Sequence, residues 1–495
     1  MEIQFQKSVV PYLRTVIQSR QNQEQTQQVR LSDAMPDIGK VLAAWGQVLL
    51  RGKEWRNDSF LVSGGVKTWV LYSPEDGTKP QCVESWLPFQ MKWDIPDTEQ
   101  DGTIIVCPGK ATVDARMLSD RKLMVRANVT LDSWALIRED AVISTPEEGE
   151  QNFQMLKNTY PMLLPAEAGE KAMEMEESLA LPMTDQPIET LLRSTIEPQI
   201  TESKLVGDKL VMRGSAHIHL LYMGTDGRIH NWGTDIPLSQ FAQLEDQYEQ
   251  SAEALICVAV TEWETELGQE GTVNVKASLT AQYIIYDRRE ITVVEDMYCP
   301  RRQMDLQKEE IRLPAVLDIQ EKTLRAEAES KNLTGGILDA DFIPDSPEFT
   351  REDDRINTHL CGTFQLLGMD GEGNLTTENC RWEDDWSVPM SEEAEMGFQM
   401  KTIQKPEFSA MTARTEIPVV EMATQQRPLT AVTDAKMGEE VQPDPNRPSL
   451  ILRRADQESL WEIAKQTGST VEEIRKLNGL TEEPDEHQML LIPVS

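Results

Sequence analysis

The sequence predicts a mainly β protein with a small mixed module at its C-terminal end. Three observations support this: alternating or β-branched runs separated by Asp-Gly turns, a segment that repeats along the chain, and a C-terminal stretch with two helix-start signals. At 495 residues the chain is long for one domain, since domains of about 150 residues predict three or four. We therefore expect three related antiparallel β domains, followed by a small domain in the order strand, helix, helix, strand.

The repeat is clearest between two segments that align without a gap. "DSFLVSGGVKTWVLYSPEDG", which begins at Asp58, matches "DKLVMRGSAHIHLLYMGTDG", which begins at Asp208, so the offset is 150 residues. The same offset relates "VRANVT" at Val125 to "VKASLT" at Val275. A weaker third copy begins at Asp354, now offset by 146 residues from the second. The Asp-Gly pairs supply the positive φ that tight hairpins need, so each copy is expected to be antiparallel.

Domain limits follow from these copies and from changes in composition. The β domains are expected at residues 31–145, 185–300 and 301–423, with the third the most divergent. The remaining segments are expected to be an N-terminal segment at 1–30, an acidic connector at 146–184, a flexible linker at 424–448 and the small domain at 449–495.

Two short helices are predicted within the last domain. Ser459 with Glu462, and Thr470 with Glu473, each fit the pattern in which a side chain and the backbone cap a helix start reciprocally. Apolar runs flank the pair at 450–452 and 489–492, and each run is short enough to be a strand. The predicted order is therefore strand, helix, helix, strand.

Composition limits the partners and the compartment. The formal net charge of −36 and the pI near 4.5 argue against nucleic acid, anionic membrane surfaces and anionic wall polymers as direct partners. The first 28 residues contain no apolar run long enough for a signal peptide, and no stretch approaches the roughly 20 apolar residues of a membrane span. We expect a cytoplasmic protein. The six cysteines lie far apart without a C-x-x-C pair, so buried free thiols are expected.

No catalytic or metal constellation stands out. His217 and His219 share one strand face near His230, but the equivalents of the first two in the first copy are Lys67 and Trp69, so a metal site is not expected there. The acidic segment "RWEDDWSVPMSEEAE" matches no calcium loop and is interpreted as a solvated face. Nucleophile, zinc-protease and phosphate-loop motifs are absent from the sequence. We predict no enzyme, no cofactor and no metal.

Two tryptophans within this acidic segment leave two interpretations open. Trp382 and Trp386 lie among acidic residues, which is unusual for a core and more usual at an interface, where aromatic side chains anchor contacts. Both the core and the interface interpretation are kept.

The C-terminal motifs "LW.IA", "LN" and "LLIP" resemble the LysM family over Leu450–Ser495. The resemblance implies that N-acetylglucosamine polymers lie between the first strand–helix loop and the last helix–strand loop. Here Gln457-Glu458-Ser459 replaces the usual Gly-Asp-Thr, and Glu486-His487 replaces Pro-Gly, so side chains obstruct close backbone approach. Protein binding is therefore preferred over glycan binding. The candidate contact residues are Glu458, Ser459, Trp461, Asn478 and His487.

The N-terminal "TQQVRLSDAMPDIGKVLAAWGQVLLRG", the β repeats and the LysM module together resemble SPOCS-domain proteins of endospore-forming bacteria. The order of its parts is similar to that of SipL-like morphogenetic proteins of Clostridia. The resemblance implies a non-enzymatic scaffold in the mother-cell cytoplasm, at the forespore surface and in the spore coat. Its expected partners are a SpoIVA-like coat ATPase, bound through LysM, and other coat proteins, with self-association through the β domains. The alternative is a LysM-mediated binder of peptidoglycan or its lipid-linked precursor during cortex formation.

Overall fold

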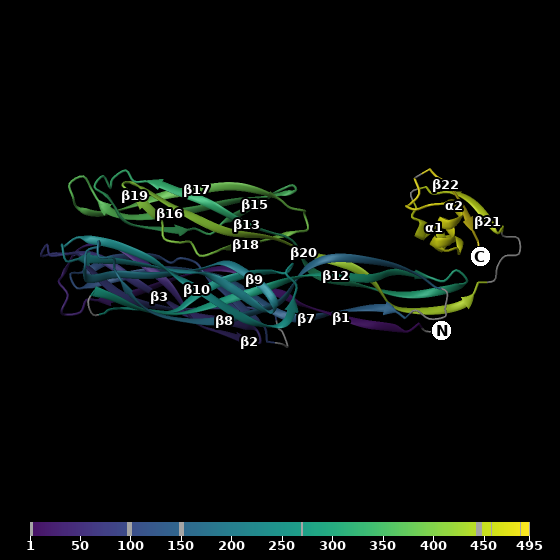
Figure 1. The fold of residues 1–495 in the computed structure, drawn as a ribbon, viewed down its shortest axis with the longest axis horizontal. Helices are drawn as coiled ribbons and strands as arrows, with labels where there is room; N and C mark the ends of the chain where they lie inside the picture. Colours follow the sequence, from purple (N-terminus) through teal and green to yellow (C-terminus); the bar gives the residue numbers. More distant parts are fainter. Residues whose placement is uncertain are drawn as a thin grey trace.

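The computed structural model describes residues 3–96, 101–147, 153–268, 271–441, 448–456, 458–485 and 487–494. Strands dominate it, and two short helices lie near the C-terminus, so the mainly β prediction is confirmed. The molecule is elongated, with β units lying side by side and a small C-terminal module at one end (Figure 1). We call residues 5–146 unit 1, residues 154–298 unit 2 and residues 302–440 unit 3.

Each unit is bracketed by a long first strand and a long last strand that pair antiparallel. These pairs are β1 (Phe5–Arg30) with β7 (Lys122–Pro146), β8 (Gln154–Ala180) with β12 (Thr272–Tyr298), and β13 (Arg302–Glu329) with β20 (Thr412–Glu440). Units 2 and 3 meet along these strands, because Val316 of β13 pairs with Leu163 of β8.

Shorter strands complete each unit. In unit 1 they are β2 (Ile38–Arg56), β3 (Ser59–Pro74), β4 (Gln81–Asp94), β5 (Thr103–Pro108) and β6 (Thr112–Ser119). In unit 2 they are β9 (Ile188–Gly224), β10 (Ile229–Tyr248) and β11 (Glu253–Leu267). In unit 3 they are β14 (Gly336–Pro344), β15 (Glu348–Glu352), β16 (Arg355–Met369), β17 (Leu375–Pro389), β18 (Glu395–Met400) and β19 (Glu407–Ser409).

Two layers enclose the core of each unit. In unit 1 the sheet β2-β3-β4 packs over the sheet that contains β1 and β7, and Phe60 and Val125 are fully buried between them. The same arrangement recurs in unit 2, where β9 and β10 cover β8, β11 and β12, and in unit 3, where β14 to β17 cover β13 and β20. Alternation along the strands explains this, since one face of each strand is apolar and meets the other layer.

The repeat found in the sequence has a counterpart in three dimensions. Tyr72 and Tyr222 occupy matching places in the cores of units 1 and 2, and neither side chain is more than 1% exposed. The matching turns contain Gly77, Gly227 and Gly373, with φ of 72°, 76° and 83°. Side-chain-bearing residues rarely adopt this conformation, so glycine is what allows the chain to reverse there.

Three segments expected outside the β domains are largely strands. Residues 5–30 form β1, residues 154–180 form β8, and residues 424–440 continue β20. The flexible linker is therefore wrong over residues 424–440, and its residues 442–447 lie outside the described residues. The limits expected for the N-terminal segment and the acidic connector stay a prediction. Glu and Ala, which are frequent in β8, rank low as strand formers, but pairing with a neighbouring long strand overrides this preference. The remaining domain limits stay a prediction.

The paired long strands of the three units extend beyond their sheets as three ribbons that pack together. Tyr12 of β1, Met162 of β8 and Leu313 of β13 share one buried cluster there, with matching side chains from the last strands. We call this part the stalk: residues 5–14, 137–146, 154–164, 287–298, 302–316 and 424–440. In Figure 1 the stalk extends to the right from the sheets and reaches the C-terminal module.

Nearer the sheets, a buried cluster of charged side chains joins the units. Arg193 of β9 contacts Asp341 and Asp339 of β14, with Nη1–Oδ2 distances of 2.5 and 3.3 Å. Lys405 Nζ lies 2.9 Å from Asp339 and 3.2 Å from Asp341. The Arg193 guanidinium also stacks over Trp45 of unit 1, 4.8 Å from the ring centroid. We call these five residues the junction, since they connect all three units.

Charge compensation decides the protonation state in the junction. Burial works against ionisation of Asp341, but Arg193 and Lys405 outweigh it and hold the pKa of Asp341 below its ordinary value. A buried carboxylate with two cations close by is a stable arrangement only while all partners are present. The junction should therefore be sensitive to removal of any one of them.

A disulfide also crosses between units 1 and 2. Cys107 and Cys257 are bonded, with Cα atoms 5.8 Å apart and a sequence separation of 150 residues. The two cysteines are thus equivalent positions of the repeat that face each other. The expectation of free thiols is wrong for this pair, because the fold brings together two residues that the sequence places far apart. Cys82, Cys361 and Cys380 are not disulfide-bonded.

Candidate functional site: the C-terminal module and its contact with the stalk

The C-terminal module consists of β21 (Leu450–Arg454), α1 (Leu460–Thr467), α2 (Val471–Asn478) and β22 (Met489–Pro493), with β21 and β22 paired antiparallel. The helices begin where the sequence predicts. Ser459 Oγ accepts the Glu462 backbone N–H at 3.2 Å, and the Glu462 carboxylate accepts the Ser459 N–H at 2.9 Å. Thr470 Oγ1 accepts the Glu473 N–H at 3.2 Å and begins α2.

A carboxylate bridges the two loops that would border a sugar groove. Glu483, in the loop between α2 and β22, accepts the Leu460 N–H at 2.9 Å and the Arg475 guanidinium at 3.2 Å. This position is favourable because backbone N–H groups at a helix N-terminus attract negative charge. The bridge places an acidic side chain between the loops where the LysM resemblance places the glycan. Gln457 and Glu486, two of the substituted loop positions, lie outside the described residues.

Four of the five predicted contact residues make contacts within the chain. Glu458 pairs with Arg453, and Ser459 caps α1. Asn478 fixes the end of α2 to β22, since its amide donates to the Leu491 carbonyl at 2.6 Å and accepts the Leu491 N–H at 2.7 Å. His487 is exposed. Trp461, the remaining member, contacts the stalk.

Trp461 attaches the module to the end of β12. Its indole Nε1 donates to Asp296 Oδ2 at 2.9 Å, and its ring lies edge-on to Tyr298 with centroids 4.8 Å apart. Lys465, one turn further along α1, lies 2.6 Å from the same Asp296 oxygen. Tyr298 donates its hydroxyl to the Ser469 carbonyl at 2.9 Å. The module is therefore docked on the stalk through one face of α1 and the turn after it.

The docking contact fixes the ionisation of its central carboxylate. Burial opposes charge on Asp296, but hydrogen bonds from Lys465, Trp461 and Lys308 outweigh it and hold the pKa of Asp296 below its ordinary value. Burial, with Glu473 nearby, raises the pKa of Tyr298 to about 12. At neutral pH the contact thus consists of a carboxylate between two ammonium groups, beside a neutral phenol. The sequence carries no motif that marks Asp296 or Tyr298, because both end an ordinary strand.

The module turns an apolar sheet face to solvent. Leu450, Leu452, Met489 and Leu491 are 51, 62, 50 and 42% exposed, and the strand register places them on the same side. On the other side, Leu490 and Ile492 are fully buried under the helices. We call these four exposed residues the outer face. Contiguous exposed apolar side chains on a small module are typical of interaction surfaces.

The histidines considered as metal ligands do not converge. His217 Nδ1 lies 3.1 Å from Asp235, and His230 Nε2 lies 3.0 Å from Asp226. His219 is buried beside Asp339 of the junction. His217 and His230 thus each contact a different carboxylate, and His219 lies apart from both, beside the junction.

Trp382 and Trp386 pack on the core of unit 3, so the core interpretation holds. Trp382 meets Phe342 edge-on with ring centroids 5.7 Å apart, and the Trp386 indole donates to Glu421 at 2.5 Å. Glu383 and Asp385 alternate to the opposite, exposed side of the strand, whereas the half-buried Asp384 lies on the same side as the two tryptophans.

The fold and the docked module define a protein of β repeats that carries a small binding module. Residues 187–267 match the family model described as "SipL, SPOCS domain", and residues 457–493 match the family model "LysM domain". These two segments thus match the SPOCS and LysM families, as the sequence resemblances predict. These are non-catalytic binding domains, and together they indicate a sporulation-related protein with a LysM module of the peptidoglycan-binding type.

No curated protein and no solved structure matches the chain. Among the described residues, no helix has the length and apolar character needed to cross a membrane. The SPOCS match fits a spore-associated location.

Proposed function

We propose that this chain is a non-enzymatic scaffold of the spore envelope that helps tether the coat to the forespore surface. In this proposal the LysM module binds a SpoIVA-like coat ATPase, while the β units supply contacts with other coat proteins or with further copies of the chain. Several modest contacts on one chain raise the effective concentration of each partner at an assembling surface. The mother-cell cytoplasm at the forespore surface is the proposed location.

The main support for this proposal is the outer face of the module. An apolar patch that spans both strands of the module, with Leu452 at 62% exposure, would cost free energy in water, and burial against a partner would recover about 25 cal/mol per Å². A sugar polymer offers mainly hydroxyl groups and would leave much of this patch without an apolar contact. An apolar protein surface is the better match. His487 and Glu458, beside the loops, are the polar contacts that we propose at the rim.

The alternative function is binding of peptidoglycan or its lipid-linked precursor during cortex formation. The LysM match itself favours it, since this family binds such glycans. In this case the contacts would lie between the two loops, and Glu483 would have to move away from the Leu460 N–H for a sugar to enter. The two functions therefore place the partner on different surfaces of the same module.

Binding by the full-length chain separates the two functions. The chain is tested against a purified SpoIVA-like ATPase from the same organism, against peptidoglycan and against chitin oligomers. Leu452→Glu on the outer face should weaken binding of the ATPase at least tenfold, because a charge would be buried against an apolar surface. Leu317→Glu, at a leucine of β13 that is 48% exposed, is the matched control and should bind like the native chain.

Glu483→Ala tests the alternative in the same assay. If the groove serves glycan, removal of the bridging carboxylate should increase binding to chitin oligomers and leave the ATPase unaffected. Retention of the native chain by glycan alone, with Leu452→Glu unchanged, would overturn the scaffold proposal.

A further inference from the structure

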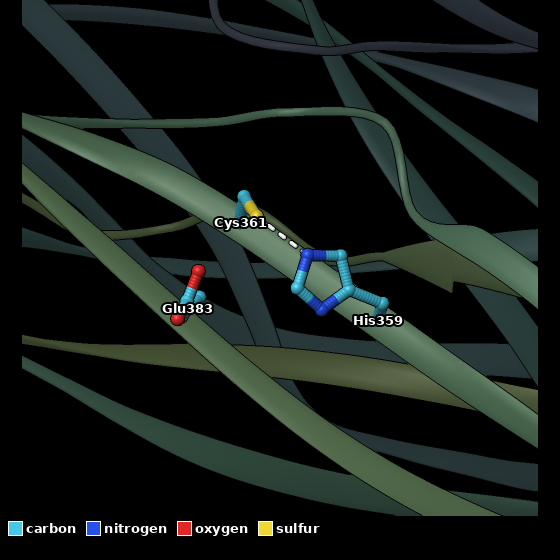
Figure 2. Close-up of side chains that lie close together, drawn as sticks. All are labelled: His359, Cys361 and Glu383. Carbon is cyan, nitrogen blue, oxygen red and sulfur yellow. Dashed lines mark hydrogen bonds between the residues drawn. The ribbon is translucent and has the colours of Figure 1, made fainter.

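A group of potential metal ligands lies on the solvent-facing side of unit 3, far from the LysM module in the fold. His359 and Cys361 are two residues apart on β16, so their side chains share a face. Glu383 of β17 is the direct cross-strand partner of Cys361, and Asp385 is the partner of His359. Figure 2 shows the imidazole and the thiol directed toward each other, with the Glu383 carboxylate on the neighbouring strand.

The donor atoms are close enough to share one ion. His359 Nε2 lies 3.0 Å from Cys361 Sγ, and one donor atom from each of His359, Cys361 and Glu383 lies within 4.8 Å of the other two. Tetrahedral Zn²⁺ with bonds of about 2.0–2.3 Å separates its donor atoms by about 3.3–3.8 Å. The most widely separated donor atoms would have to approach each other by about 1–1.5 Å to share one ion. Among the described residues, no other group of three such donors is this compact.

Neighbouring charged side chains contact both His359 and Cys361. Asp385 Oδ1 lies 2.7 Å from His359 Nδ1, which leaves Nε2 directed at the thiol. A carboxylate that holds the second nitrogen of a histidine fixes both the tautomer and the ring orientation of a ligand. Arg381 contacts the Cys361 sulfur and is itself paired with Asp345 at 2.7 Å. The Cys361 sulfur thus lies beside both a guanidinium and an imidazole.

We propose that His359, Cys361 and Glu383 form a Zn²⁺ site on the β16–β17 pair. His359 Nε2, Cys361 Sγ and a Glu383 carboxylate oxygen are the three protein ligands, and water occupies the fourth position. A mixed nitrogen, sulfur and oxygen set selects zinc over calcium or magnesium, which prefer oxygen donors alone. Asp385 is a positioning residue that acts through His359. This site is independent of the LysM contact proposed above.

Cobalt titration of the full-length chain tests the proposal. The metal-free chain is titrated with Co²⁺ in excess Ca²⁺, which occupies simple carboxylate clusters. The expected result is one equivalent of Co²⁺ with a thiolate charge-transfer band and the strong visible bands of a tetrahedral site, displaced by one equivalent of Zn²⁺. Asp385→Asn should keep the spectrum and weaken Zn²⁺ binding by about 10–100-fold.

Matched variants separate this site from other thiols and imidazoles. Cys361→Ser and His359→Ala should each abolish the spectrum, whereas Cys380→Ser and His230→Ala should leave it unchanged. A native chain without the thiolate band would overturn the proposal, and so would a Cys361→Ser chain that keeps it. Thermal unfolding without metal checks that each variant remains folded.

Discussion

Replacement of Arg193 by alanine should weaken the connection among the three units. The guanidinium lies 2.5 Å from Asp341 and 3.3 Å from Asp339, and the three side chains are 4, 6 and 1% exposed. It also stacks on Trp45. Without it, two buried carboxylates retain Lys405 as their nearby cation.

The size of the effect follows from burial. Removal of one member of a buried ion pair costs about 3–5 kcal/mol, because the remaining charge is desolvated without its partner. The lost stacking on Trp45 would add to this, since desolvated cation–π contacts contribute about 2 kcal/mol. Lys405 offsets part of the loss by neutralising Asp339 and Asp341. We therefore expect a destabilisation of about 3–5 kcal/mol in total.

Hydrogen exchange measures this loss where it occurs. Peptides that cover residues 188–196 and 337–343 should exchange on the order of 10²- to 10⁴-fold faster in Arg193→Ala, because opening of the junction is what exposes them. Arg14→Ala is the control. Its partner is Glu139, the two side chains are 39 and 34% exposed, and such pairs contribute at most about 1 kcal/mol. Equal exchange in both variants would refute the assignment of the junction as a main connection between units.

Three further predictions concern protonation, docking and the disulfide. Burial, with Lys405 nearby, lowers the pKa of His219, so that below about pH 6.5 only the unfolded chain takes up a proton at this residue. The unfolding free energy should therefore fall by up to about 2 kcal/mol from pH 7 to 5, and His219→Gln should remove this pH-dependent loss. Asp296→Asn should undock the LysM module at pH 7 and increase the radius of gyration in small-angle X-ray scattering; unchanged scattering would contradict this. The native chain should stay docked until the pH falls below about 4, because the lowered pKa of the Asp296 carboxyl keeps it charged above that range. Cys107→Ser should lower the unfolding free energy by about 2–5 kcal/mol, and thermal unfolding that matches the native chain would count against it.

The sequence predicts those features that depend on neighbouring residues. The turn glycines Gly77 and Gly227 and the helix caps Ser459 and Thr470 lie where the local pattern places them. The β units recur at the predicted offset because the same apolar alternation and the same turns recur. Such signals act within a few residues, so one sequence is enough to recognise them.

Features that depend on contacts distant in sequence could not be predicted. Trp461 is 165 residues from Asp296, and nothing near either residue identifies the other as its partner. The polar strand β8 has little intrinsic strand preference, and its pairing with the neighbouring strands, β12 above all, makes it a strand. The ligands on β16 and β17 meet through strand register, which the sequence alone does not specify.

We propose that a coat protein binds the outer face of the LysM module while the module stays docked on the stalk. Hydrogen exchange of the full-length chain, with and without the purified SpoIVA-like ATPase, tests it most directly. We predict that the ATPase slows exchange in residues 450–454 and 489–493 and that Leu452→Glu abolishes this protection. Protection confined to the loop residues 481–485, produced by peptidoglycan and not by the ATPase, would contradict the account and favour the glycan-binding alternative.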